Sequence, residues 1–242
     1  MGDSMIPKKI HYCWFGRNPL PDSARKCIAS WKKYFPDYEV IEWNEDNYDV
    51  TALPYIREAY ENKKYAFVSD YARFDILYRH GGLYFDTDVE VVRSFDDILA
   101  GGAFMGCESD DPITVNAGLG LGAPAGLPFY RTVLDFYQTQ HFVFQDGTLN
   151  TETVVTKVTK LLLECGLCSA PGIQTVEGIT VYPRDYFNPL NSNTGVLNKT
   201  ANTHSIHWYS MTWLSPAMRL RTRLTRPLHR LLGEDFFHRG KK

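Results

Sequence analysis

Two aspartates one residue apart give the strongest chemical signal in this sequence. Asp86 and Asp88 end the segment GGLYFDTD (residues 81–88), directly after a short apolar run. Two carboxylates at a turn can address one point, and hard oxygen donors suit Mn²⁺ or Mg²⁺. Such a cation can bridge the diphosphate of an activated sugar and stabilise the leaving group. The alternative is a solvated acidic turn, since D-x-D alone is common. The flanking apolar segments favour a function, because a buried unpaired carboxylate is costly.

A second pair of charged residues precedes this segment. Asp70 and Arg73 stand three residues apart, on one face of a helix predicted over residues 65–79. Asp70 can accept hydrogen bonds from a sugar hydroxyl, and Arg73 can neutralise a phosphate or hold Asp70 in place. Spacing alone favours the alternative, an ordinary ion pair within the helix worth tenths of a kcal/mol.

Alternating strands and helices surround these residues and predict how they are held. Strands are predicted at residues 8–15, 38–43, 83–85 and 89–92, and helices at 21–35, 52–62 and 65–79. This alternation indicates an α/β layer with a largely parallel sheet. Ligands of such sheets bind beyond the carboxyl ends of the strands, and Asp86 follows such an end.

The second half of the chain is less regular. Residues 101–126 are rich in glycine, and the stretch NAGLGLG (residues 116–122) looks like a loop. It lacks the Gly-Lys-Ser/Thr of a phosphate-binding P-loop. Helices are predicted at 128–137 and 153–165, and a strand at 180–183. We expect one catalytic domain over residues 1–216, followed by a separate tail.

The predicted tail, residues 217–242, is basic and amphipathic. It holds eight Lys or Arg against two Asp or Glu, whereas the rest of the chain holds 18 against 26. Leucines and arginines recur there at helical spacing, with Pro227 beginning, kinking or breaking the helix. Such a segment can lie on an anionic membrane or dock on its own domain, and the sequence leaves both alternatives open.

Net charge, cysteine content and the N-terminal residues exclude several classes of protein. The net charge of −2 is not typical of a nucleic-acid-binding protein. Five cysteines, an odd number in a chain of this length, do not indicate a disulfide framework. Cys165 and Cys168 form a single CxxC without a partner pair for zinc. With neither a secretory signal nor a membrane-spanning apolar run, we expect a cytoplasmic protein, peripheral on the inner face of the membrane if the tail binds there.

Two segments together resemble a known family. The run VSDYARFDILYRHGGLYFDTDVE (residues 68–90) resembles the signature of the DXD-containing sugar transferases, glycosyltransferase family 32, which includes initiating α-1,6-mannosyltransferases and bacterial capsular polysaccharide transferases. The opening IPKKIHYCWFG (residues 6–16) is similar to the first strand of that family. The resemblance implies a GT-A-type fold, a Rossmann-like mixed sheet flanked by helices that binds a nucleotide-sugar.

The resemblance also implies roles for individual residues. It assigns Trp14 to the nucleotide base, on which a flat indole can stack, and it assigns Asp70 and Arg73 to the donor sugar and its phosphates. Tyr84 would line the donor pocket, and Asn116 would contact the donor sugar by a looser analogy. These assignments place the catalytic residues Asp70, Arg73, Asp86 and Asp88 around one donor.

The segment HWYSMTW (residues 207–213) is similar to the His-x-x-x-x-Ser-Trp ending of the family. His207 would join Asp86 and Asp88 as a metal ligand, and Thr212 and Trp213 would close over the diphosphate. Thr212 stands where the family has Ser, and its hydroxyl can make the same hydrogen bonds. The Thr-Gly-Pro element of the family is not evident, and residues 150–153 occupy its place, which leaves the acceptor open.

The implied activity is retaining, Mn²⁺- or Mg²⁺-dependent transfer from a nucleotide-sugar, a UDP-sugar in the first instance, to a glycan acceptor in surface polysaccharide or capsule synthesis. The acceptor can be lipid-linked. GDP-mannose is the alternative donor. Two other classes stay open: a non-catalytic carbohydrate- or nucleotide-sugar-binding module, and a metal-dependent phosphohydrolase that uses the same carboxylates. The intact Asp70, Arg73, Asp86 and Asp88 favour the transferase.

Overall fold

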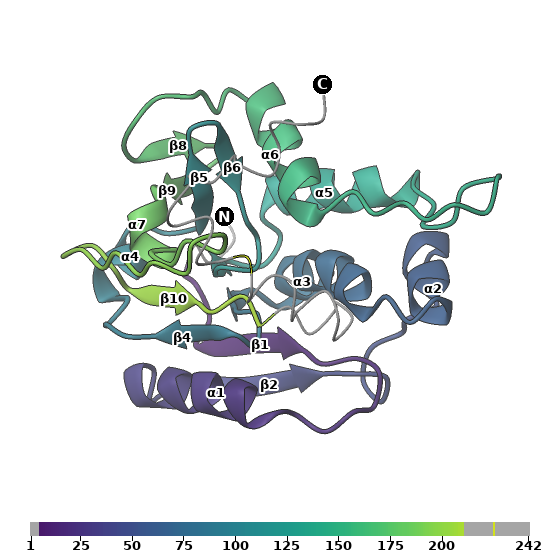
Figure 1. Cartoon of the computed structure of the whole chain (residues 1–242), viewed down its shortest axis with the longest axis horizontal. Coiled ribbons are helices and arrows are strands. Elements are labelled where there is room, and N and C mark those ends of the chain that lie inside the picture. Colours follow the sequence, from purple (N-terminus) through teal and green to yellow (C-terminus); the bar gives the residue numbers. More distant parts are fainter. Residues whose placement is uncertain (1–4, 211–224, 226–242) are drawn as a thin grey trace.

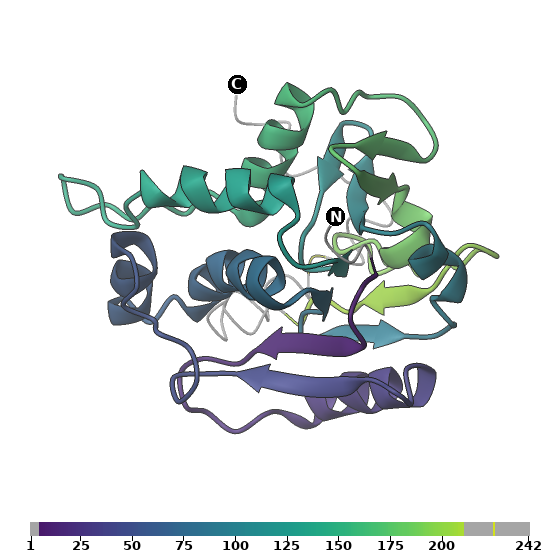
Figure 2. The same cartoon turned by 180° about the vertical axis from the view of Figure 1, so that it is seen from behind.

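The computed structural model describes residues 5–210 together with residue 225. A central sheet carries helices on both faces (Figures 1 and 2). In chain order the elements are β1 (Lys9–Cys13), α1 (Asp22–Tyr34), β2 (Glu39–Trp43), α2 (Pro54–Glu61), α3 (Tyr65–His80), β3 (Gly82–Tyr84), β4 (Val89–Val91), α4 (Asp96–Ala100), β5 (Phe104–Asp110), β6 (Ile113–Val115), β7 (Leu121–Ala123), α5 (Pro128–Gln138), α6 (Val154–Glu164), β8 (Gln174–Val176), β9 (Ile179–Tyr182), α7 (Arg184–Phe187) and β10 (Ser205–His207).

The main sheet is mixed. Its eight strands run in the order β2-β1-β3-β7-β5-β9-β8, with β6 paired to β5. β1 is parallel to β2 and β3, and β5 is parallel to β9, whereas the other four pairs are antiparallel. The largely parallel sheet expected from the strand–helix alternation was therefore wrong beyond β3, while the mixed sheet implied by the family resemblance is confirmed. Short connections such as the one from β5 to β6 permit only antiparallel pairing.

The two faces of the sheet have separate hydrophobic cores. Successive strand residues point to opposite faces, so Leu83 packs with Trp31 of α1, whereas Tyr84 packs with Phe74 of α3. Helices α2, α3, α5 and α6 cover the face to which Tyr84 points. This burial on both faces explains why β3 reads as a continuous apolar run.

The glycine-rich stretch predicted as a loop contains strand β7. Gly122 pairs with Leu83 of β3 and with Phe104 of β5. A Cβ atom at Gly122 would lie 2.2 Å from the Phe104 ring, so this glycine permits close packing rather than a flexible loop. The sequence also did not predict strands β5, β6 and β8, because turn residues lie next to them and interrupt the alternation typical of a strand.

A tight glycine turn delivers the chain from α3 into β3. Gly81 has φ +62° and its amide closes the helix on the Leu77 carbonyl, and Gly82 has φ +109°. A Cβ at Gly81 would lie 2.7 Å from the backbone nitrogen of Ala125. The turn demands glycine for both reasons. It places the end of β3, and hence Asp86, beside α3.

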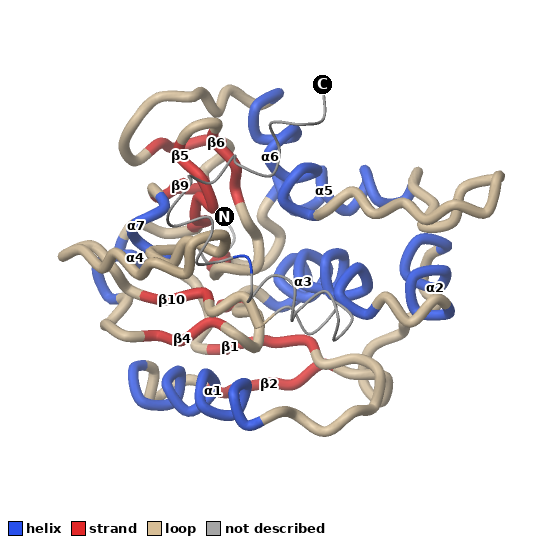
Figure 3. Tube along the Cα trace, in the orientation of Figure 1, coloured by secondary structure: helices blue, strands red, loops and turns tan. Residues whose placement is uncertain are grey.

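A second, two-stranded sheet brings in the chain end. Strand β10 pairs antiparallel with β4, with His207 opposite Val89. The connection from α7 to β10 is a loop of irregular structure (Figure 3). Residues separated by more than 100 positions thus meet next to Asp88.

Other sequence predictions can be placed on this structure. The predicted helices over 21–35, 52–62, 65–79, 128–137 and 153–165 correspond to α1, α2, α3, α5 and α6. Thr212, Trp213 and the predicted tail over 217–242, apart from residue 225, lie outside the described residues. No helix in the described part of the chain is long and apolar enough to cross a membrane.

Candidate functional site

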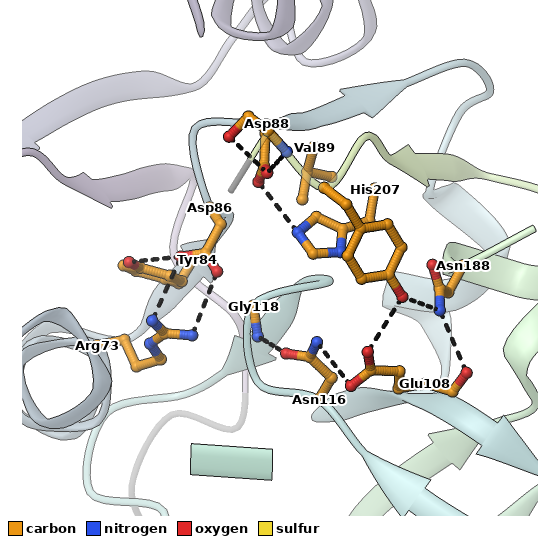
Figure 4. Close-up of polar contacts among 12 residues, drawn as sticks. Arg73, Tyr84, Asp86, Asp88, Val89, Glu108, Asn116, Gly118, Asn188 and His207 are labelled. Carbon is orange, nitrogen blue, oxygen red and sulfur yellow. Dashed lines mark hydrogen bonds and ion pairs between the residues drawn. The ribbon is translucent and has the colours of Figure 1, made fainter. Parts of the chain in front are cut away.

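Asp86 lies at the end of β3 and is held by neighbours from three segments (Figure 4). Its backbone amide donates to the Gly118 carbonyl at 3.2 Å, and the Tyr84 hydroxyl donates to its Oδ1 at 3.1 Å. The Arg73 guanidinium approaches its two oxygens at 3.4 and 3.5 Å. The side chain remains 30% exposed, so one side of Asp86 is open to a ligand.

Arg73 joins Asp86 to Asp70. Its Nη2 lies 2.9 Å from Asp70 Oδ1, and its Nε donates to the Ser69 carbonyl at 3.0 Å. The Arg73 and Asp70 side chains are only 4% and 11% exposed, which rules out an ordinary surface ion pair. Burial raises the pKa of Asp70 to about 6, against the opposing charge of Arg73. Burial also raises the pKa of Asp86; Arg73 opposes this, and the charge of Asp88 adds to it.

Asp88 is bound from the other direction by the β10 segment. His207 Nε2 lies 3.1 Å from its Oδ1, and the Ser210 amide and hydroxyl donate to its Oδ2 at 2.8 and 2.9 Å. Although burial acts in the opposite sense, His207 and Ser210 hold the pKa of Asp88 below its usual range. In the same way, burial disfavours the cationic ring, but the Asp88 charge and hydrogen bond raise the pKa of His207.

The predicted metal ligands are brought together only in part. Within residues 5–210 and 225, no group of three His, Cys, Asp or Glu side chains is close enough to hold a metal ion by itself. Asp88 Oδ1 and His207 Nε2, 3.1 Å apart, have the spacing of two neighbouring ligands of one cation, about 3 Å. The ring atom His207 Nδ1 is buried and has no hydrogen-bond partner among the described residues. The donor set fits a divalent cation if diphosphate oxygens complete its shell.

A polar network on the opposite wall of the site extends from β5. Asn116 Oδ1 accepts from the Gly118 amide at 2.7 Å, and its Nδ2 donates to Glu108 Oε2 at 3.3 Å. The Tyr209 hydroxyl donates to Glu108 Oε1 at 3.2 Å and accepts from Asn188 at 2.7 Å. The structure therefore places the predicted Asn116 beside Asp86. Sequence reasoning missed Glu108, because it lies in β5, a strand that the sequence did not predict.

Trp14 lies just past the end of β1, where strand-end ligands bind. It is half-buried, and its Nε1 donates to the Asn18 carbonyl at 2.6 Å. The stacking of Trp14 on a nucleotide base stays a prediction.

Two further residues were not singled out in the sequence. Ser210 binds Asp88 directly, and the family ending that contains it was the available signal. Lys157 of α6 is buried at 1% exposure, and its Nζ lies 5.6 and 5.9 Å from the rings of Tyr55 and Tyr137. A lysine between apolar positions on a helix face was the signal for this residue. Its charge, like that of Arg73, acts to lower the pKa of Asp70.

Known proteins share part of this sequence. Residues 21–105 match the family described as glycosyltransferase sugar-binding region containing DXD motif. Inositol phosphoceramide mannosyltransferase 3 of Schizosaccharomyces pombe is 31% identical over 144 residues, which cover 57% of this chain and 40% of that protein. Mannosyl phosphorylinositol ceramide synthase SUR1 of Saccharomyces cerevisiae is 28% identical over 134 residues, which cover 54% and 34%. The chain thus spans less than half the length of these relatives.

A solved structure shares the fold. PaToxG glycosyltransferase superposes with a TM-score of 0.51 at 19% identity, over 66% of this chain and 69% of that one. The GT-A-type fold predicted from the sequence is confirmed. The matched segment contains Asp70, Arg73, Asp86 and Asp88, the residues that meet at the end of β3. Within this chain, residues 21–105 are thus similar to the glycosyltransferase sugar-binding region that contains a DXD motif.

Proposed function

We propose that this chain is a retaining, metal-dependent glycosyltransferase that moves a hexose from a nucleotide-sugar to a hydroxyl of a glycan or lipid-linked acceptor. One observation carries the proposal: α3, the end of β3 and the β10 segment bring Arg73, Asp86, Asp88 and His207 into one partly open site. A cation and an arginine on the same site suit a diphosphate leaving group, whose negative charge grows as the glycosidic bond breaks.

Asp88 and His207 are the residues that would hold a divalent cation, with Asp86 facing the same space. Bound there, Mn²⁺ or Mg²⁺ would supply Lewis-acid stabilisation of the leaving diphosphate. Ser210 fixes the carboxylate of Asp88 through two hydrogen bonds and so keeps Oδ1 directed at His207. Tyr84 performs the same task for Asp86.

Arg73 would supply positive charge beside the phosphates. Its position is fixed on two sides, by Asp70 and by the Ser69 carbonyl, and so is set before a ligand binds. A preorganised charge avoids the cost of reorganisation during reaction. Asp70 would then accept a hydrogen bond from a hydroxyl of the transferred sugar, and Trp14 would stack on the base.

Retention of configuration is proposed through a front-face mechanism. The three aspartates at the site are each engaged: Asp70 by Arg73, Asp86 by Arg73 and Tyr84, and Asp88 by His207 and Ser210. None is placed as the free nucleophile of a retaining glycosidase-type carboxylate pair. The leaving phosphate would assist the incoming hydroxyl on the same face. Trapping a glycosyl ester of Asp or Glu by mass spectrometry would contradict this mechanism.

Among donors, a nucleotide-activated mannose now has the stronger support. The two relatives described above are named for mannose transfer, whereas the sequence resemblance alone pointed first to a UDP-sugar. We therefore place GDP-mannose first and UDP-hexoses second. A role in capsule or other surface polysaccharide synthesis is retained as a proposal for the acceptor side.

A donor panel tests the proposal. The purified chain is incubated with GDP-mannose and a series of UDP-sugars, with Mn²⁺ or with EDTA, and release of nucleoside diphosphate is measured. We expect release from one donor only, dependent on the cation. Binding without release would instead indicate a non-catalytic module, and release of phosphate from simple esters would indicate a phosphohydrolase.

A further inference from the structure

Glu108 is a carboxylate in the site that none of the roles above uses. It lies on β5, and its backbone carbonyl accepts from Asn188 Nδ2 at 3.2 Å, which anchors the strand at this position. Each of its two carboxylate oxygens receives one hydrogen bond, from Tyr209 and from Asn116. The carboxylate plane is thereby fixed, and it lies across the site from Arg73 (Figure 4).

The partners of Glu108 differ in kind from those of the aspartates. Asp86 faces a guanidinium and Asp88 faces an imidazole, whereas Glu108 is bound by a phenol and an amide. In the part of the chain that the structure describes, no Lys, Arg or His nitrogen forms an ion pair with Glu108. A carboxylate has about four lone-pair positions, so Glu108 can accept further hydrogen bonds from a ligand.

Contacts link Glu108 to both halves of the site. Its partner Asn116 is next to Asp86, because a Cβ at Gly118 would lie 3.1 Å from Asn116 Oδ1 and 2.0 Å from Asp86 Oδ2. Its other partner, Tyr209, packs its ring 4.2 Å from the ring of His207. Glu108 therefore borders the same space as the residues proposed to bind the diphosphate.

The charge of Glu108 restricts the ligand group that can lie against it. A phosphate would be repelled there, and the phosphates have a favourable position beside Arg73. A neutral group rich in O–H donors fits, because hydrogen bonds to a carboxylate are charge-assisted and short. In a nucleotide-sugar that group is the hexose.

We propose that Glu108, oriented by Asn116 and Tyr209, binds hydroxyls of the transferred hexose and so selects the sugar rather than the nucleotide. This inference rests on the proposed function, since it assigns the sugar end of the same donor. It adds a sugar contact on the wall opposite to Asp70.

The test compares binding of GDP-mannose with binding of GDP, each titrated calorimetrically in the presence of Mn²⁺; the donor found by the panel replaces this pair if it differs. For Glu108→Gln we expect the affinity for the nucleotide-sugar to fall ~10- to 100-fold. The affinity for the nucleoside diphosphate should change less than twofold. Deoxy-sugar donors should identify the hydroxyl: its removal weakens binding to the native chain but not to the variant.

Glu42→Gln is a matched control. Glu42 also receives one tyrosine hydroxyl, from Tyr12 at 2.6 Å, and one asparagine amide, from Asn44 at 2.9 Å, but it lies on β2 outside the site. Both affinities should stay unchanged in this variant. Tyr209→Phe is a second, milder variant that removes one orienting bond, and it should weaken nucleotide-sugar binding selectively by about threefold.

Three results would overturn the inference. Equal weakening of both ligands by Glu108→Gln would mean that Glu108 supports the general structure of the site. Unchanged affinity for both would mean that it does not touch the donor. A native chain that binds the nucleoside diphosphate but gains nothing from the attached sugar would also refute it, whereas a chain that binds neither ligand would refute the proposed function itself.

Discussion

Two buried histidines in this molecule have opposite electrostatic surroundings. His11 on β1 is bound at both ring nitrogens by neutral groups: Trp43 Nε1 donates to its Nδ1 at 3.0 Å, and its Nε2 lies 3.0 Å from the Gly81 carbonyl. His207 on β10 faces the Asp88 carboxylate with one nitrogen and has no partner among the described residues for the other. Both are nearly inaccessible to solvent, so their partners make the difference.

The partners decide which charge state each ring prefers. Burial lowers the pKa of His11 to about 4, with a further contribution from the nearby His80. Burial also acts to lower the pKa of His207, but the charge and hydrogen bond of Asp88, together with the charges of Asp86 and Glu108, raise it. His11 has a hydrogen-bond partner at each ring nitrogen in its neutral form, which indicates a structural role. His207 has a charged neighbour and a ring nitrogen that no described residue pairs, as expected of a residue that receives a ligand.

The largest effect is expected from removing the charge beside His207. Asp88→Asn keeps an oxygen for Ser210 but loses the negative charge, so sugar transfer should fall on the order of 10³-fold at saturating Mn²⁺. The measurement is kcat/KM for the donor found in the panel. Trp43→Phe, which removes the neutral partner of His11, is the control and should retain transfer in the folded protein. Retained activity and manganese dependence in Asp88→Asn would remove the basis of the comparison.

The next prediction is that acid destabilises the fold by protonating His11. The folded-state pKa of His11 is depressed below the ordinary value of 6.5, so its contribution to stability is present above pH 6.5 and is lost as the pH falls toward 4. The loss amounts to about 3 kcal/mol of unfolding free energy. Protonation would also set a second N–H against the Trp43 donor, which already occupies Nδ1.

Urea unfolding between pH 7 and pH 4 checks this prediction. Trp43→Phe should be less stable than the native chain at pH 7, because a hydrogen bond is lost. The difference in unfolding free energy between the variant and the native chain should become smaller at pH 4, since His11 protonates more easily without the indole donor. A constant gap across this range would show that His11 does not titrate in the folded protein as its surroundings predict.

A third effect tests the steric fit around Asp86. A Cβ at Gly118 would lie 2.0 Å from Asp86 Oδ2, so Gly118→Ala must displace that carboxylate from Arg73. Transfer should fall on the order of 10²-fold, as for displacements of about 1 Å at reacting groups. Gly101→Ala is the control, because its Cβ would come no closer than 3.2 Å to a neighbour. If both variants transfer sugar equally well, Asp86 does not need its present position.

The sequence predicted the first half of the fold better than the second. From β1 to β4 the elements are long enough, or bounded clearly enough by glycine, for local patterns to decide. Between β5 and β7 the strands hold three to seven residues, and glycines such as Gly122 are there to permit packing against Phe104. That packing is a property of distant neighbours, so no local pattern could reveal it.

The site shows the same limit. Asp86 and Asp88 could be read from their own spacing, and Asp70 with Arg73 from helical spacing, whereas His207 came only through the family resemblance. Glu108 can be recognised only in the folded structure, because its partners Asn116 and Tyr209 come from separate segments of the chain. Residues chosen by long-range packing stay hidden until the fold is known.

The smallest effect is expected from removing the Ser210 hydroxyl, which orients Asp88 beside His207. Ser210→Ala removes the hydroxyl that donates to Asp88 Oδ2 and leaves the backbone amide in place. Groups that orient a metal ligand typically contribute 10- to 100-fold to affinity, and with one of two bonds retained we expect a Mn²⁺ affinity about tenfold lower. Titration of the chain with Mn²⁺ measures this, with Ser109→Ala as the control, because Ser109 is a half-buried serine whose hydroxyl donates to the Asp111 carbonyl. Unchanged affinity would mean that His207 and the amide alone orient Asp88, whereas a drop would show that the His207 site, unlike that of His11, depends on the orientation of a carboxylate.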